Sequence, residues 1–248
     1  MIYTERFKAP QSLSGKEFSY CPGCHHGLVH RIIAEVIDEL NIQGITIMVA
    51  PVGCSVFAND FFELDGTIAA HGRAPAVATG IKRARPENVV FTYQGDGDLA
   101  AIGTAEIIHA ANRGEKITTI FINNAIYGMT GGQMAPTTLL GMKTTTTPYG
   151  RNEKNEGYPL RVSEILKEIR GVAFLSRTKV STPQDVIRTK KQIKKAFIAQ
   201  LKGIGYGIVE VLSTCPTNWG LTPIESMKWL EENMVKEFPI GVFIDKVG

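Results

Sequence analysis

The chain has 248 residues, 44% of them hydrophobic and 21% charged, which is long enough to bury the core of one large domain. A formal net charge of +3 is too small to indicate a nucleic acid or an anionic membrane as partner. Because no apolar run approaches the roughly 18 residues that span a bilayer, and the first residues lack the apolar core of a signal peptide, we expect a cytoplasmic protein without a membrane partner.

The first part of the chain combines a polar arm, a cysteine pair and a helix. Residues 1–19 are mixed and polar, so we expect an N-terminal arm that lies over another part of the protein. Cys21 and Cys24 follow in a Cys-Pro-Gly-Cys motif. Residues 28–40 repeat apolar side chains at helical spacing, which predicts a helix with one face in the core.

Two stretches that end in small or polar residues come next. The apolar run 45–50 predicts a strand, and residues 51–55, which contain Cys54, predict a tight turn directly after it. Farther on, the motif His71-Gly72-Arg73 ends a run of small residues and precedes a helix that we expect over 76–83. Arg73 is a candidate partner for a carboxylate.

The most informative motif follows two further strands. The run Val89 to Tyr93 breaks at Gly95-Asp96-Gly97-Asp98, where glycines let the backbone approach a ligand closely and a carboxylate can hold a cation. The run 117–122 breaks at Asn123-Asn124, and an expected helix over 100–113 joins the two strands. One strand-helix-strand unit puts both breaks at the carboxyl edge of a parallel sheet, where such sheets bind ligands.

These two breaks predict a site for a metal-bound polyphosphate. Mg²⁺ prefers near-octahedral oxygen ligands and needs few protein groups when phosphates supply the rest. Asp96, the side-chain oxygen of Asn124 and a backbone carbonyl just beyond, which we assign to Ile126, would supply three ligands. The N-terminus of the helix expected over 100–113 lies beside Gly97 and Asp98, where free N–H groups favour a diphosphate.

The rest of the chain continues the alternation of strands and helices. A polar, glycine-rich loop over 131–159 is long enough to be functional. Further segments follow in order: 162–169, a strand near 172–175, a helix over 183–200, a strand over 207–212 and a helix over 223–237. We predict one α/β domain (1–248) with a doubly wound, mostly parallel sheet, helices on both faces, long ligand-side loops, an arm (1–19) and a C-terminal helical tail (about 221–248).

The four cysteines of the chain indicate a metal centre. In a reducing cytoplasm, Cys21, Cys24, Cys54 and Cys215 seldom mean two disulfides. Cys54 and Cys215 each follow a predicted strand, so we expect both at the edge that carries Asp96. Four thiolates suit structural zinc or a 4Fe-4S cluster, and spacing alone does not choose between them. A redox dithiol at the Cys-x-x-Cys pair, or unrelated buried cysteines, are further alternatives, and we assign the neighbouring histidines no ligand role, expecting them near the centre or in solvent.

Two motifs together resemble a known family. The pair Gly-Asp-Gly and Asn-Asn, about thirty residues apart, resembles the thiamine-diphosphate motif. A longer pair of motifs resembles the β subunit of 2-oxoacid:ferredoxin oxidoreductases: Gly-Asp-Gly-Asp followed by Asn-Asn-Ala-Ile-Tyr-Gly-Met-Thr-Gly-Gly-Gln. The resemblance covers roughly residues 20–219. It implies the thiamine-diphosphate-binding fold, Mg²⁺ at Asp96, Asn124 and Ile126, and a 4Fe-4S cluster at the four cysteines.

The resemblance also implies a set of cofactor contacts. They lie in the Gly-Cys-Ser turn, the His-Gly-Arg motif and the two strand breaks: Val52, Gly53, Ser55, His71, Gly95, Gly97, Asp98, Gly128, Met129 and Thr130. His71 is expected to contact the diphosphate. The catalytic Glu that thiamine enzymes place beside the aminopyrimidine ring is expected from a partner subunit, so no catalytic residue is assigned in this chain.

The implied activity is oxidative decarboxylation of a 2-oxo acid to acyl-coenzyme A and CO₂, with electrons passed through the cluster to ferredoxin. The implied partners are an α subunit, with γ and δ subunits expected as well. Relatives that act on 2-oxoglutarate carry a basic residue soon after the third cysteine, whereas residues 56–59 offer no cation here. This difference favours a branched-chain or aromatic 2-oxo acid, and we expect a branched-chain substrate such as 2-oxoisovalerate. Alternatives are 2-oxoglutarate or pyruvate as substrate, or a non-catalytic α/β binding module with zinc on the cysteines.

Overall fold

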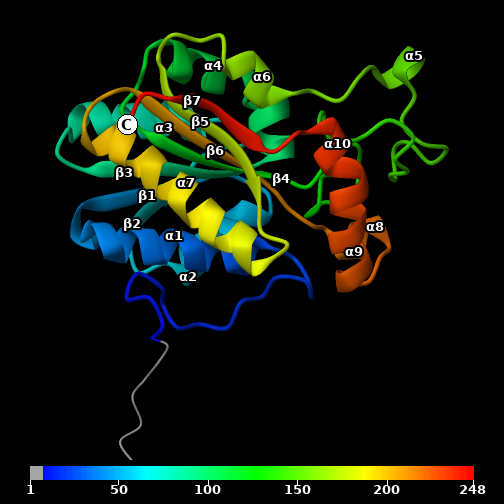
Figure 1. The fold of residues 1–248 in the computed structure, drawn as a ribbon, viewed down its shortest axis with the longest axis horizontal. Helices are drawn as coiled ribbons and strands as arrows, with labels where there is room; N and C mark the ends of the chain where they lie inside the picture. Colours follow the sequence, from blue (N-terminus) through cyan, green and yellow to red (C-terminus); the bar gives the residue numbers. More distant parts are fainter. Residues whose placement is uncertain (1–7) are drawn as a thin grey trace, which may run out of the picture.

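The computed structural model describes residues 8–248, so the first seven residues of the expected arm lie outside the described part. Seven strands form one sheet in the order β2-β1-β3-β4-β6-β5-β7 (Figure 1). The strands are β1 (Thr46–Ala50), β2 (Asp65–Ile68), β3 (Val89–Gly95), β4 (Thr118–Asn123), β5 (Val172–Lys179), β6 (Tyr206–Leu212) and β7 (Gly241–Asp245). All neighbours pair in parallel except β5 and β7, which are antiparallel.

The central strands β3, β4 and β6 are buried along almost their whole length because both faces of the sheet are covered (Figure 1). On one face, α1 (His26–Leu40) and α7 (Pro183–Leu201) pack through residues such as Ile33 and Phe197. On the other face lie α3 (Ala74–Ala84), α4 (Thr104–Asn112) and α6 (Val162–Leu166). The predicted doubly wound α/β fold is therefore confirmed.

The shorter elements lie mainly at the ends of the strands. They are α2 (Ala58–Phe61), α5 (Glu153–Glu156), α8 (Pro216–Trp219), α9 (Pro223–Trp229), α10 (Val235–Glu237), 3₁₀ turns at Gln43–Ile45 and Cys54–Phe57, and π-helical turns at Asp98–Ile102 and Leu230–Met234. Within residues 8–248, every helix is too short or too polar to cross a membrane.

Strand β2 was not expected from the sequence, and two further parts of the fold differ from the expectation. The segment expected as one helix over 100–113 begins with the π-helical turn Asp98–Ile102 and becomes α-helical only at Thr104. The expected C-terminal helical tail is helical over Pro223–Glu237 but then returns to the sheet as β7. The reason is packing, because β7 covers the outer edge of β5 with its partly buried Phe243 and Ile244 against the core.

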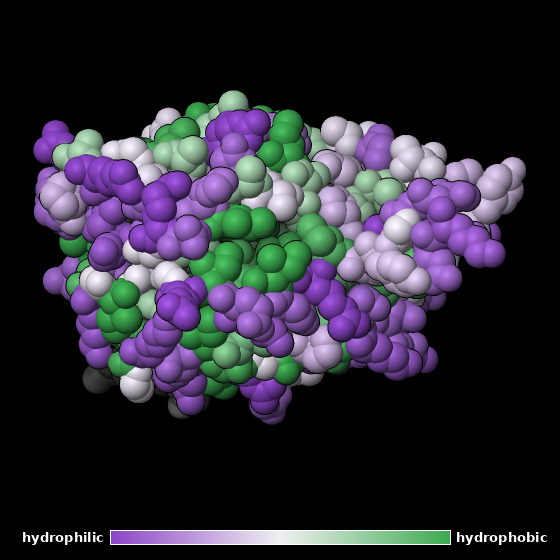
Figure 2. Space-filling view, turned by 90° about the horizontal axis from the view of Figure 1, so that it is seen from above, coloured by the Kyte–Doolittle hydropathy of each residue, from purple (hydrophilic) through white to green (hydrophobic). Residues whose placement is uncertain are grey.

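The long loop after β4 divides into two parts. Its first part folds back over the ends of β3 and β4, while residues around α5 form an arm that projects from the body (Figure 1). Figure 2 shows the same arm as a mostly hydrophilic projection. The arm nevertheless carries two exposed aromatic side chains, Tyr149 and Tyr158, which are 97% and 69% exposed.

Candidate functional site

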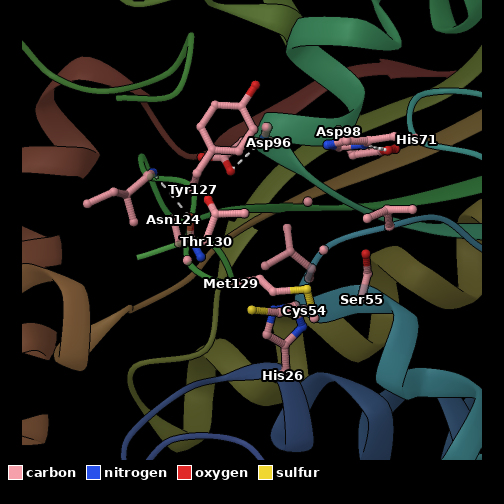
Figure 3. Close-up of a pocket in the computed structure, with 17 residues that line it drawn as sticks. His26, Cys54, Ser55, His71, Asp96, Asp98, Asn124, Tyr127, Met129 and Thr130 are labelled. Atoms are coloured by element: carbon pink, nitrogen blue, oxygen red, sulfur yellow. Dashed lines mark hydrogen bonds and ion pairs between the residues drawn. The ribbon is translucent and has the colours of Figure 1, made fainter. Parts of the chain in front are cut away.

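One pocket at the carboxyl edge of the sheet collects the residues that the sequence singled out (Figure 3). The turns after β1, β2, β3 and β4 each contribute to its lining. All ten predicted cofactor contacts line it: Val52, Gly53, Ser55, His71, Gly95, Gly97, Asp98, Gly128, Met129 and Thr130. The predicted metal ligands Asp96, Asn124 and Ile126 line the same pocket, as does Cys54.

Asp96 is the best-defined candidate metal ligand. Its side chain is buried, its Oδ1 accepts a hydrogen bond from the Gly97 backbone at 2.8 Å and its Oδ2 accepts one from Thr137 Oγ1 at 2.6 Å. Within residues 8–248 no lysine, arginine or histidine forms an ion pair with this carboxylate. Burial without a cation raises the pKa of Asp96 from 3.8 to about 6.

The neighbouring turn offers the two other oxygens. Asn124 is buried, and its Oδ1 accepts a hydrogen bond from the Ile126 backbone at 3.2 Å. Ala125 between them adopts a left-handed conformation with φ 60°, which turns the chain back sharply after β4. A desolvated carboxylate that lacks a counter-charge, beside an amide oxygen and a backbone carbonyl, is a donor set that fits Mg²⁺.

The raised pKa of Asp96 predicts a pH dependence in two directions. Protons compete with the metal, so Mg²⁺ affinity should fall about tenfold per pH unit well below pH 6 and level off above it. Without metal the sign is reversed: protonated Asp96 is the favoured form in the fold, so the contribution of Asp96 to stability should fall by about 3 kcal/mol as pH rises from about 4 to about 6. Calorimetric Mg²⁺ titration measures the first trend, and the difference in unfolding free energy between the unaltered protein and Asp96→Asn across this range measures the second. A difference that does not change over this range would contradict the assignment.

Asp98 lines the pocket, but its carboxylate is occupied within the protein. Its Oδ1 accepts hydrogen bonds from the Gly72 backbone at 2.6 Å and from His71 Nδ1, and its Oδ2 accepts one from Gln94 Nε2 at 2.7 Å. Asp98 therefore fixes the ring of His71 and leaves its other nitrogen for a ligand (Figure 3). Arg73, next in the motif, instead pairs with Glu106, as the sequence suggested.

Glycine at position 97 is required by a close contact. A Cβ placed there would lie 2.2 Å from the ring of Tyr127, so only glycine admits this ring against the Gly-Asp-Gly-Asp turn. Tyr127 lines the pocket and was not singled out from the sequence, although it stands inside the Asn-Asn-Ala-Ile-Tyr-Gly motif. Burial, followed by the charges of Asp96 and Asp98, raises the pKa of its phenol.

The four cysteines gather beside this pocket. Burial and the other three cysteines raise the pKa of Cys24 to about 12, and burial with Cys215 and Cys21 raises that of Cys54 to about 11. A Cβ on Gly128 would lie 3.5 Å from the sulfurs of both Cys54 and Cys215. The chain segments that carry Cys24 and Cys215 are also joined directly, because Thr214 Oγ1 donates a hydrogen bond to the Gly23 carbonyl at 2.7 Å.

The donor chemistry fits a centre that ionises the thiols. Buried sulfurs with raised pKa values become thiolates only when a cation compensates their charge. Among residues 8–248, no three histidine, cysteine or acidic side chains converge closely enough to bind one metal ion. A zinc ion needs all four sulfurs about 2.3 Å from one atom, whereas a 4Fe-4S cluster takes each sulfur on a different iron.

The histidines beside the cysteine pair are buried. Of the two expected placements, near the centre or in solvent, the placement in solvent is therefore wrong. His26 lines the pocket (Figure 3). Its Nδ1 forms a hydrogen bond of 2.6 Å with the hydroxyl of the buried Tyr93. His30 is held by the Tyr20 hydroxyl at 2.8 Å. Burial lowers the pKa of His26 to about 4, so its ring is neutral at neutral pH.

A buried charge network supports the turn after β4, and the sequence analysis missed it. Glu210 on β6 accepts hydrogen bonds from Asn123 Nδ2 at 2.8 Å and from Ser163 Oγ, and it forms an ion pair of 2.8 Å with Arg177. Arg177 also pairs with Glu164 at 2.6 Å. The signal in the sequence was a charged residue inside each of two apolar runs, Arg177 and Glu210. Such residues are rarely buried without a partner of opposite charge, so the pattern indicates a buried ion pair.

The rim of the pocket is apolar and open. Val52 and Met129 line it and are 43% and 42% exposed. Within the described chain, the lining contains neither a lysine or arginine nor a glutamate. Phe61 and Phe62, which follow the third cysteine, are buried and do not line the pocket.

Comparison with known proteins places these features in context. Residues 51–211 match the family described as thiamine pyrophosphate enzyme, C-terminal TPP binding domain. Subunit VorA of a ketoisovalerate oxidoreductase from Methanothermobacter thermautotrophicus is 50% identical over 227 residues, which are 92% of this chain and 48% of that protein. The chain thus spans about half the length of this relative.

Two further relatives are matched over most of their length. Subunit KorB of a 2-oxoglutarate synthase from Archaeoglobus fulgidus is 36% identical over 92% of this chain and 85% of that protein. In structure, the chain is similar to a 2-oxoglutarate:ferredoxin oxidoreductase from Magnetococcus marinus with 2-oxoglutarate, coenzyme A and succinyl-CoA bound, with a TM-score of 0.77 and 25% identity over 98% of this chain and 87% of that chain.

Proposed function

Because this chain belongs to the thiamine pyrophosphate enzymes, and among them to the subunits of 2-oxoacid:ferredoxin oxidoreductases, we propose that it is the β subunit of a coenzyme A-acylating enzyme of this class. The reaction would oxidatively decarboxylate a 2-oxo acid to acyl-coenzyme A and CO₂ and pass the electrons to ferredoxin. The observation that carries the proposal is the single pocket in which the predicted magnesium ligands, the predicted cofactor contacts and Cys54 meet.

Each part of the pocket has a role in this proposal. Bound thiamine diphosphate would supply the carbanion chemistry of the reaction. Asp96, Asn124 and the Ile126 carbonyl would hold its Mg²⁺, and His71, fixed by Asp98, would donate to the diphosphate. Glycine at position 97 lets the ring of Tyr127 pack against the turn that carries Asp96 and Asp98.

The cysteines would hold a 4Fe-4S cluster next to the thiamine pocket. Cys54 belongs to the pocket lining and to the cysteine group, so electrons would have a short path from substrate to cluster. The charge of Asp96 also acts on Cys54 and Cys215, which supports close proximity of the two metal sites. A cytoplasmic setting, where thiols remain reduced, suits this centre.

The proposed substrate is a branched-chain 2-oxo acid such as 2-oxoisovalerate. The pocket of the described chain has no lysine or arginine to meet a second carboxylate, and the relative named for ketoisovalerate is 50% identical whereas the one named for 2-oxoglutarate is 36% identical. The main alternative is 2-oxoglutarate, named in both the KorB relative and the structural neighbour. Pyruvate is the remaining alternative.

The proposed partners are an α subunit, γ and δ subunits, and ferredoxin. The absence of a glutamate in the pocket lining of residues 8–248 supports a catalytic Glu from the α subunit, and the exposed Val52 and Met129 offer an apolar rim for it to cover. The chain alone should therefore not turn over. Complete 2-oxoacid-dependent dye reduction by the purified chain would contradict this proposal.

The test of the cluster is anaerobic purification followed by metal analysis. We expect a brown protein with about four irons per chain, bleached by dithionite, and loss of most of this iron in Cys215→Ser, because one of the four ligands is then missing. A colourless protein with one zinc per chain would instead favour the non-catalytic binding module. For the substrate, rates of dye reduction by the assembled enzyme with 2-oxoisovalerate, 2-oxoglutarate and pyruvate decide among the alternatives.

A further inference from the structure

The loop after β4 contributes one side chain, Thr137, that contacts the proposed metal ligand Asp96. Thr137 is fully buried, and its hydroxyl donates to Asp96 Oδ2 at 2.6 Å, while the Gly97 backbone donates to Oδ1. Both carboxylate oxygens are therefore oriented by hydrogen bonds, and the Asn124 and Ala125 backbone adds further hydrogen bonds to the same carboxylate. Thr137 therefore contacts the proposed metal ligand Asp96 but does not itself line the pocket.

The next residue, Thr138, holds the turn after β4 that carries the other proposed metal ligands. Thr138 Oγ1 donates to the carbonyl of Ala125 at 2.6 Å and accepts a hydrogen bond from the Ala135 backbone at 2.9 Å. Ala125 precedes Ile126 and follows Asn124, the other proposed metal ligands. Two successive threonines therefore join this one loop to both strand breaks that form the site.

A buried arginine holds these threonines in place. The side chain of Arg151 is 6% exposed, and its guanidinium donates to six backbone carbonyls in two chain segments. In the first segment the acceptors are Pro136 at 2.8 Å and Thr138 at 2.5 Å, with Ala135 at 3.5 Å. In the second they are the carbonyls of residues 156–158 at 2.7 to 3.1 Å. A planar group with five N–H donors can tie two turns together in this way, whereas a lysine cannot.

We propose that Arg151 and Thr137 are positioning residues that set the affinity of the metal site: Arg151 fixes the turn over residues 135–138, and that turn places the Thr137 hydroxyl on Asp96. This inference rests on the proposed binding of Mg²⁺ and thiamine diphosphate by Asp96, Asn124 and Ile126. It assigns the loop after β4 a function in the chain's own cofactor site, through backbone contacts that no side-chain motif encodes.

The expected effect follows from what hydrogen bonds to metal ligands contribute. Groups that orient a ligand from outside the coordination shell change metal affinity by about 10- to 100-fold when removed. Thr137→Val keeps the shape of the side chain and removes only the hydroxyl, so we expect the dissociation constant for the metal to rise by about this factor. Thr137→Ser restores the hydroxyl and should bind within about threefold of the unaltered protein.

The experiment measures metal binding directly and does not depend on turnover. Mn²⁺ serves as the probe in place of Mg²⁺, and its free and bound forms are counted by electron paramagnetic resonance in the complete enzyme with thiamine diphosphate present. Thr189→Val is the matched control, because Thr189 is equally buried and its hydroxyl forms two hydrogen bonds of 2.7 Å, with Thr178 and the Lys179 carbonyl at the end of β5, and none of these residues lines the pocket. The control should lower the melting temperature and leave Mn²⁺ affinity unchanged.

The link between the two positioning residues is tested with Arg151→Lys. We expect weaker Mn²⁺ binding in Arg151→Lys alone and little further loss when it is added to Thr137→Val, since the two changes break one chain of contacts. Equal Mn²⁺ affinity in Thr137→Val and the unaltered protein, or an equal loss in Thr189→Val, overturns the inference. Failure of the unaltered protein to bind Mn²⁺ with thiamine diphosphate would instead overturn the proposed function itself.

Discussion

Replacing Asp96 by Asn is expected to abolish magnesium-dependent binding of thiamine diphosphate while leaving the fold intact. The change removes the only proposed anionic ligand of Mg²⁺ and keeps the shape of the side chain. Burial raises the pKa of Asp96 to about 6, so the ionised carboxylate destabilises the metal-free chain at neutral pH. A neutral Asn removes this destabilisation, and the free energy of unfolding without metal should stay the same or rise by up to about 3 kcal/mol.

Two measurements separate these effects. Calorimetry with Mg²⁺ and thiamine diphosphate should show a loss of binding of at least about 100-fold, and denaturant unfolding without metal should show no loss of stability. Asp98→Asn is the control, because Asp98 lines the same pocket but holds His71, so it should weaken diphosphate binding with little effect on the metal. If D96N and D98N lose Mg²⁺ affinity equally, the assignment of Asp96 as the ligand is wrong.

Replacing Arg177 by Met should destabilise the protein by about 3 to 5 kcal/mol, since it leaves Glu210 buried without its cation. Both side chains of this pair are at most 1% exposed, so water cannot take the place of the guanidinium. The loss should be visible as a lower denaturant midpoint with an unchanged slope.

The matched control is Arg161→Met, which removes an arginine from an exposed ion pair with Glu237 and should cost less than about 1 kcal/mol. Adding Glu210→Gln to Arg177→Met should recover part of the stability, because Gln is neutral and still offers hydrogen bonds to Asn123 and Ser163. A cost for Arg177→Met no greater than that of the control would contradict a stabilising role for the buried Arg177–Glu210 pair.

The sequence predicted the parts of the site that stand at the ends of strands. Apolar runs located β1, β3, β4 and β6, and the polar residues that follow them had to meet at one edge because the strands are parallel. The comparisons confirm the family that the Gly-Asp-Gly-Asp and Asn-Asn motifs suggested. Placement of the individual cofactor contacts and of the metals stays a prediction.

The parts that were missed depend on contacts that leave no periodic pattern. Thr137 and Arg151 lie in a loop, and the partners of Arg151 are backbone carbonyls, which every sequence offers equally. Glu210 and Arg177 did carry a signal, as charges inside the runs Tyr-Gly-Ile-Val-Glu-Val-Leu and Val-Ala-Phe-Leu-Ser-Arg-Thr-Lys, but their pairing required the neighbouring register of β5 and β6. β7 was missed because its single antiparallel pairing depends on a partner far away in the sequence.

The position of β6 has a consequence for how the protein is made. β6 lies between β4 and β5 although it follows both in the chain, and Cys215 comes just after it. During synthesis Cys21, Cys24 and Cys54 emerge early, but they can meet Cys215 only after the last central strand has been inserted. We therefore expect a nascent chain without β6 to have three of the four cysteines and no complete site. The proposed iron centre should then bind only after β6 has been inserted between β4 and β5.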